Sequence, residues 1–174
     1  MTLEEFIKDF DKENVVVLLG GKRKVLPADM DLLVRLGEVL ATKTKKIKFR
    51  SGNADGADYY FSQGIFNIDK SRLEVITPYS GHRKKANIAN DTISLDTINI
   101  ASEPEVVYQS KGNKKTEKLV DQYVDGARNR ISMKAAYIIR DTVMVIELRR
   151  FHRLPLLFSM TTWIILKQAG RAIR

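Results

Sequence analysis

The sequence predicts an α/β fold, with a single domain built as a Rossmann-like, three-layer, doubly wound parallel sheet. Residues 15–19 form a continuous apolar, β-branched run of the kind that is buried on both faces in parallel sheets. Helical patterns alternate with further strand-like runs after it, which is typical of right-handed βαβ crossovers. The 174 residues, 44% of them hydrophobic, are enough for one compact core. We assign this domain to residues 1–148 and an atypical tail to residues 149–174.

The first half of the chain has the order βαβαβ. The strand at 15–19 ends in Gly20 and Gly21, and residues 30–40 then place leucines along one helical face. A second strand ends near Phe49, and the helix after it is expected to end at Gly64, a plausible C-cap. A third strand at 73–77 is stopped by Pro78.

The second half is less regular. Residues 79–85 are expected to form an exposed loop, in which His82 is interpreted as a solvated residue rather than a catalyst. Residues 86–101 are expected to be helical in part, and apolar residues from Val120 to Ile131 mark another helix face. Residues 142–146 are expected to form a fourth buried strand.

A small-residue turn between the second strand and its helix is a candidate anion site. Here the chain reads Ser51-Gly52-Asn53-Ala54-Asp55-Gly56-Ala57-Asp58. A strand that runs into a helix brings backbone N–H groups and the positive end of the helix dipole to one point. The turn at 21–23 ends a neighbouring strand, so both turns are expected to share one crevice at the carboxyl ends of the sheet. The alternative is an ordinary βα connection whose glycines serve steric needs.

Composition narrows the chemistry. There is no cysteine, and two histidines are too few to suggest a His-rich metal site, so we predict no metal and no other cofactor. The acidic N-terminus and the lack of a membrane-length apolar run predict a cytoplasmic protein without a membrane partner. The net charge of +9 suits nucleic acid, but six of the basic residues follow Glu147 with no acid among them. The tail therefore carries most of the imbalance.

These motifs together resemble the SLOG superfamily of Rossmann-like proteins, which includes the "lysine decarboxylase-like" phosphoribohydrolases and the DNA-processing protein A family. The family pattern is Gly-Ser-Arg after strand one and Ser-Gly-x-Ala-x-Gly-Ala-Asp after strand two. This chain matches the second motif fully, and the first as Gly21-Lys22-Arg23, with Lys in place of Ser. The segment from Ala127 to Arg130 is similar to the Arg-bearing helix that precedes strand four. The resemblance covers roughly residues 13–146.

The resemblance implies a nucleotide-like ligand, such as a mononucleotide or an ADP-ribose-like molecule, with its phosphate over the two turns. Arg23 is suited to a bidentate phosphate contact. The Ser51 hydroxyl and the amides of residues 52–54 are suited to an anion nest. The implied binding residues are Gly21, Lys22, Arg23, Ser51, Gly52, Asn53, Ala54, Asp55, Asp58 and Asn129.

Three acidic or basic side chains have open roles. Asp55 and Asp58 are each able to bind ribose or to cap the helix, and for Asp58 we favour the structural role. The resemblance places Arg128 at an active site, with a surface salt bridge on its helix as the alternative. It also implies a homodimer.

The chain departs from the family after residue 146. The hydrolase branch has a Gly-Gly-x-Gly-Thr loop and a Glu there, and this chain has neither. Glu147 is the nearby carboxylate that is a candidate for catalysis, and its alternative is an ordinary polar residue at the end of a strand. A shifted reading of suitable codons from Phe151 onward can restore Gly-Gly-Thr, so we hypothesise that about the last 25 residues are frameshifted. The alternative is a genuine tail that closes the core with a strand or helix at 154–166.

Three functions follow, and whether the protein is an enzyme stays open. The leading hypothesis is a nucleotide-binding module. The first alternative is a nucleotide phosphoribohydrolase that cleaves an N-glycosidic bond, which needs a carboxylate beside the reacting carbon. The second is single-stranded DNA binding, suggested by the net charge and by Lys43, Lys45, Lys46 and Lys48.

Overall fold

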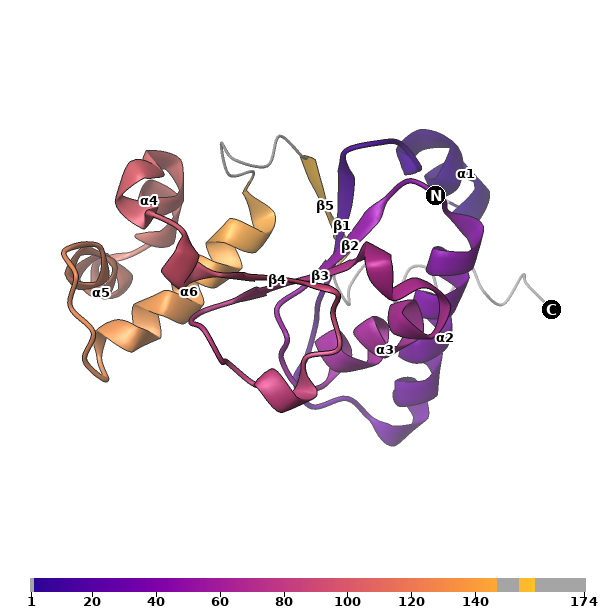
Figure 1. Cartoon of the computed structure of the whole chain (residues 1–174), viewed down its shortest axis with the longest axis horizontal. Helices are drawn as coiled ribbons and strands as arrows, with labels where there is room; N and C mark the ends of the chain where they lie inside the picture. The colour runs from indigo at the N-terminus through magenta and orange to yellow at the C-terminus, as the bar shows by residue number, and fades with distance from the viewer. Residues whose placement is uncertain (1, 147–153, 159–174) are drawn as a thin grey trace.

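The computed structural model describes residues 2–146 and 154–158, and contains one parallel sheet (Figure 1). The strand order is β4-β3-β2-β1-β5. The strands are β1 (Val15–Leu19), β2 (Lys48–Ser51), β3 (Leu73–Thr77), β4 (Asp91–Ser94) and β5 (Leu154–Phe158). From β1 the chain works outward to β4 and then returns to the other side of β1, so the winding reverses between β1 and β5. The predicted doubly wound α/β fold is confirmed.

Helices cover both faces of the sheet and make three layers (Figure 1). One side carries α1 (Leu3–Phe10), α2 (Pro27–Lys43) and α3 (Ala57–Asp69). On the other side α6 (Ser132–Val145) lies between the sheet and the two helices α4 (Pro104–Ser110) and α5 (Lys114–Val124). No helix among the described residues is long and apolar enough to cross a membrane.

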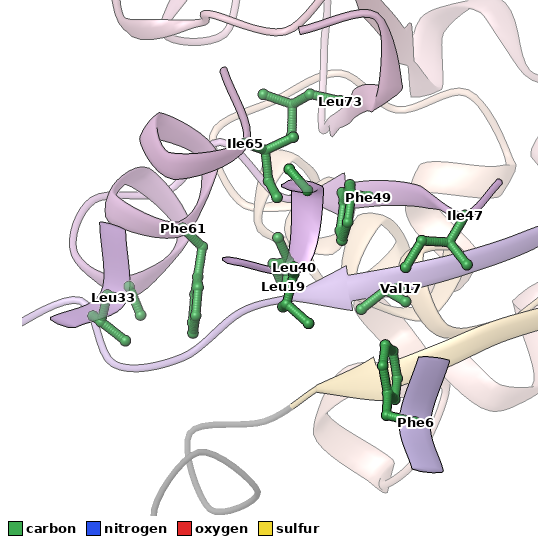
Figure 2. Close-up of a cluster of buried hydrophobic side chains, with 12 residues drawn as sticks. Phe6, Val17, Leu19, Leu33, Leu40, Ile47, Phe49, Phe61, Ile65 and Leu73 are labelled. Carbon is green, nitrogen blue, oxygen red and sulfur yellow. The ribbon is translucent and has the colours of Figure 1, made fainter. Parts of the chain in front are cut away.

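The α2/α3 face of the sheet is an apolar core (Figure 2). Alternate residues of a strand point to opposite faces, so Val17 and Leu19 of β1 point to this side together with Phe49 of β2. Leu33 and Phe61 meet them from α2 and α3. Phe6 of α1 joins the same cluster and is 2% exposed. The run at 15–19 is therefore a strand because both of its faces are covered.

The expectation that Gly64 ends its helix is wrong. Gly64 lies within α3, where α3 crosses α2 at Gly37. A Cβ atom on Gly37 would lie 2.6 Å from the carbonyl oxygen of Phe61, and a Cβ on Gly64 would collide with the backbone of α2. The missing side chains let the two helices approach closely, which outweighs the low helix propensity of glycine.

The strand expected at 142–146 is wrong, because these residues continue α6 and its C-cap. A short apolar run does not distinguish a buried strand from a buried helix. The deciding feature is the four-residue spacing of Ile139 and Val143, which are both 0% exposed and pack toward one cluster. The strand that follows α6 is β5, at Leu154–Phe158.

The remaining differences lie between β3 and α6. Residues 86–101 contain β4 and short 3₁₀ turns at Lys84–Ala86, Leu95–Thr97 and Ile100–Ser102, with no α-helix. Helix α5 ends at Val124, so Ala127 and Ile131 lie beyond it. In the tail, β5 pairs with β1 along its whole length, as the alternative of a closing strand or helix at 154–166 allows, while residues 159–166 lie outside the described residues.

Candidate functional site

The two turns singled out in the sequence are bound to each other at the carboxyl ends of β1 and β2. The Ala57 N–H donates to the Lys22 carbonyl over 3.0 Å. Gly56 has a φ of +80°, and a Cβ there would collide with the carbonyl groups of Lys22 and Arg23. The glycine and alanine of this motif therefore serve to seat the first turn on the start of α3.

The expected anion nest is filled by the protein's own Asp58. This carboxylate is 7% exposed and accepts a hydrogen bond from the Gly21 N–H over 3.3 Å. Burial raises the pKa of Asp58, while the Arg140 charge and hydrogen bonds from the Gly21, Ala54 and Gly52 amides oppose that rise. Asp58 thus has a structural role, but it binds amides of the two turns instead of capping α3, whose N-cap is Gly56.

The third amide of the nest and the nearby polar side chains are also engaged. The Asn53 N–H donates to Ser51 Oγ over 3.3 Å, and Ser51 is fully buried. The Asn53 side chain donates to the His82 carbonyl over 3.3 Å. The Asn53 backbone is left-handed, with a φ of +53°. Ser51, Gly52 and Asn53 thus support the site from beneath.

Above this support lies a cavity of about 330 Å³ that draws on four segments of the chain. It is lined by Arg23 after β1, Ala54 and Asp55 after β2, His82 and Arg83 after β3, and Tyr137 and Arg140 of α6. Ligands of doubly wound sheets bind at this edge. The cavity is within the size range of small-molecule sites.

Arg140 of α6 is the most deeply buried arginine that lines the cavity. Its side chain is 6% exposed, and it donates to the carbonyl oxygen of Gly52. A Cβ on Gly52 would lie 2.5 Å from Arg140 Nη1, so the glycine makes room for the guanidinium. Arg140 Nε lies 2.7 Å from Asp141 Oδ1 without hydrogen-bond geometry. The Gly52 carbonyl therefore positions the Arg140 guanidinium in the lining of the cavity.

Arg83 lines the cavity from the loop after β3 and forms an ion pair with Asp55. Arg83 Nη1 donates to Asp55 Oδ2 over 2.6 Å, and Nη2 donates to Oδ1, which makes the contact bidentate. This hydrogen bonding lowers the pKa of Asp55. Asp55 therefore holds the loop after β3 and does not cap α3, whose N-cap is Gly56. Arg23 makes no hydrogen bond or ion pair with any other described residue.

Three aromatic rings stand beside the arginines. Tyr79, His82 and Tyr137 contact one another edge to face, with centroids 5.1 to 6.3 Å apart. Burial lowers the pKa of His82, and the positive charges of Arg140, Arg83 and Arg23 lower it further. His82 is half-buried in the cavity wall, which corrects the interpretation of it as a solvated loop residue.

Arg128 and Asn129 do not line this cavity. The Arg128 guanidinium stacks 4.1 Å from the Tyr123 ring centroid and donates to the Tyr123 carbonyl over 2.8 Å. It borders a separate hollow of about 110 Å³ beside Asp96. The Asn129 side chain accepts from the amides of Ile131 and Ser132 at the start of α6. Both residues therefore act at helix ends, and Glu147 lies outside the described residues.

Sequence reasoning missed Arg83, Tyr137 and Arg140 as site residues, although one signal was present. Arg140 falls at the helical spacing of the buried Ala136 and Ile139. A charged side chain among core positions needs a partner, and here the partner is the Gly52 carbonyl. Arg83 had no comparable signal, because its place depends on how the loop after β3 folds.

Comparison with known proteins gives no match to this chain among protein-family models, curated proteins or solved structures.

Proposed function

We propose that this protein binds a nucleotide-like ligand, a mononucleotide or an ADP-ribose-like molecule, by its phosphate at the carboxyl edge of the sheet. The observation that carries the proposal is the convergence of Arg23, Arg83 and Arg140 on one cavity. Of the described residues lining it, Asp55 is the single carboxylate, and it already neutralises Arg83. The lining residues therefore carry three positive charges against one negative charge, which suits a phosphate.

The support differs from the predicted amide nest. The amides of residues 52–54 are engaged by Asp58 and Ser51, so arginine side chains are left to contact the anion. Arg140 is fixed by the Gly52 carbonyl, and Arg23 has its guanidinium free of the other described residues. Arg140, which is held in place, and Arg23, which is able to move, can therefore both donate hydrogen bonds to one phosphate.

Calorimetric titration with inorganic phosphate, pyrophosphate, ribose 5-phosphate and AMP tests the proposal. We expect binding in the wild type and a loss of about tenfold or more in Arg23→Gln, because a charge-assisted contact contributes about 1.5–3 kcal/mol. Arg35→Gln is the matched control, since Arg35 is an exposed arginine of α2 outside the cavity. No binding by the wild type, or equal binding by both variants, contradicts the proposal.

Binding without hydrolysis is the form of the proposal that the described residues favour. Cleavage of a glycosidic bond needs a carboxylate free to act as acid, base or nucleophile. In the cavity Asp55 is ion-paired with Arg83. The DNA alternative has no comparable site, because Lys48 pairs with Asp91 and the lysines lie where the chain enters β2, away from the cavity. Release of free base from AMP would restore the hydrolase hypothesis.

We further propose a cytoplasmic homodimer as the working form of the protein. This rests on the family resemblance and on the lack of a membrane-crossing helix among the described residues. Light scattering coupled to gel filtration measures the mass, and a monomer of 19.8 kDa would contradict the dimer.

A further inference from the structure

A second cavity of about 510 Å³ adjoins the arginine-lined one. The two share Arg23, Asp55 and Arg83 in their linings. The second is otherwise lined by Lys24, Val25, Met30, Gly56, Tyr59, Tyr60 and Ala86. The Asp55–Arg83 ion pair therefore lies between two adjoining cavities, which together we call the groove. Residues of α6 line the first cavity, and residues of α2 and α3 line the second.

The two halves of the groove differ in chemistry. Both cavities are lined by Arg23 and Arg83. The first adds Arg140, whereas the second adds Lys24 together with Tyr59, Tyr60 and Met30. The two tyrosine rings meet edge to face at 5.5 Å, and the Tyr60 hydroxyl lies 3.0 Å from the Met30 sulfur. Tyr59 is 39% exposed, so part of its ring is open to a ligand. Aromatic rings and a polarisable thioether are well suited to a flat ring.

We propose that this tyrosine half of the groove binds the base of a nucleoside 5′-monophosphate whose phosphate lies among the three arginines. The inference rests on the proposed function and extends it, because it assigns the second half of the ligand to a second set of residues. The ribose then lies at the boundary, where Asp55 and Arg83 are the polar groups within reach. Stacking depends weakly on base identity, so the groove recognises the class of ligand and not one base.

The decisive experiment compares two ligands that differ by the base. AMP and ribose 5-phosphate are titrated calorimetrically into the full chain and into Tyr59→Ala. Loss of one base–aromatic stacking contact typically weakens binding by about tenfold. We expect that loss for AMP alone, with the affinity for ribose 5-phosphate unchanged.

Tyr108→Ala is the matched control. Tyr108 is 72% exposed on α4 and lies outside both cavities, so its removal is expected to change neither affinity. Met30→Gln is a second variant on the α2 wall of the groove and is expected to weaken AMP selectively as well. Thermal unfolding of each variant verifies that it is folded.

The outcomes separate this inference from the proposed function. If the wild type binds ribose 5-phosphate and AMP equally, or if Tyr59→Ala weakens both alike, the tyrosine half does not bind the base and only the phosphate site stands. If the wild type binds neither ligand, both proposals fail. Selective loss of AMP in Tyr59→Ala and in Met30→Gln, but not in Tyr108→Ala, supports both.

Discussion

The two faces of the sheet are built from the same strands and both bury apolar clusters, but the α6 face also buries charged side chains. The α2/α3 face is closed by aliphatic and aromatic side chains and by the close contact of two glycines. On the α6 face, β2 and β3 bury the Arg50–Glu74 ion pair, and α6 itself buries Arg140. Alternation along one strand produces this contrast, because Phe49 and Arg50 are neighbours that point to opposite sides.

The contrast indicates that the apolar α2/α3 face contributes mainly to stability, whereas the charged residues of the α6 face are the ones available for binding. Apolar burial on the α2/α3 face stabilises the fold at about 25 cal/mol per Å² without any need for exact partners. Buried charges cost desolvation and persist only with good geometry. Under the proposed function Arg140 also contributes to anion binding, since it lines the candidate site. The following variants test whether the charges buried on the α6 face cost stability that apolar groups would not.

The largest effect is expected from separating the buried ion pair. Arg50 Nε lies 2.6 Å from Glu74 Oε1, and both side chains are at most 5% exposed. Glu74→Gln leaves Arg50 without its charge partner and is expected to lower the free energy of unfolding by about 3–5 kcal/mol. The double change Arg50→Met with Glu74→Leu is expected to restore most of it, because apolar groups of similar volume replace both charges. Urea unfolding measures each value.

The apolar face gives the comparison for that pair. Phe61→Ala removes a buried ring from the core that α2 and α3 form, and is expected to lower the free energy of unfolding by about 3–5 kcal/mol in the same assay. The ring has no charged partner, so no matching second substitution is expected to restore this loss. If the double variant at Arg50 and Glu74 is as unstable as Glu74→Gln, then apolar groups do not replace the buried ion pair, and the proposed difference between the two faces is wrong.

A smaller effect is expected at the glycine contact of α2 and α3. In an isolated helix Gly→Ala stabilises by about 1 kcal/mol. Here Gly64→Ala is expected to destabilise by about 1–3 kcal/mol, because the new methyl group collides with the Val34 carbonyl. Gly112→Ala is the control, since its Cβ would meet nothing nearer than 3.9 Å. A more stable Gly64→Ala protein would mean that the helices separate without cost.

On the α6 face, Gly52→Ala is expected to act on binding more than on folding. The added methyl group lies 2.5 Å from Arg140 Nη1, the movable end of a long side chain, so the guanidinium shifts and loses the Gly52 carbonyl. We expect about a tenfold loss in phosphate affinity and about 1 kcal/mol of stability. Gly112→Ala again serves as the control. Unchanged phosphate affinity would exclude Arg140 from the anion site.

The sequence predicted the α2/α3 side of the molecule better than the α6 side. The segments at 15–19 and 73–77 are short runs that end at Gly20 and at Pro78, and the structure has strands there. The run at 142–146 was misassigned, since local pattern alone does not separate a buried helix from a buried strand. Helix α6 also holds Tyr137 and Arg140, two of the seven residues that line the cavity, and both lie before the misassigned run.

The candidate site was predicted in its location but not in its chemistry. Two glycine-containing turns at neighbouring strand ends do meet, as expected for a parallel sheet. The sequence did not indicate that Asp58 would turn inward and occupy the amides, because its partner Gly21 lies 37 residues away along the chain. Nor did it indicate that Arg83 would reach Asp55 from a loop without regular structure.

The smallest expected effect is a pH dependence through His82. Burial and then the charges of Arg140, Arg83 and Arg23 lower its pKa below the usual value of about 6.5. A bound phosphate offsets those charges and raises this pKa, so binding takes up a proton where the pH lies between the free and bound values. The affinity of the wild type relative to His82→Gln is therefore expected to rise as pH falls from about 7.5 to about 5.5.

Taking the ratio of the two affinities removes the phosphate's own titration near about pH 6, which acts equally on both proteins. The same lowered pKa means that the unfolded chain binds more protons than the native one below about pH 6.5. Stability of the ligand-free wild type should thus decline relative to His82→Gln on acidification, while its relative affinity increases. These opposite slopes would locate His82 beside the bound anion, whereas two parallel slopes would show that the histidine affects folding alone.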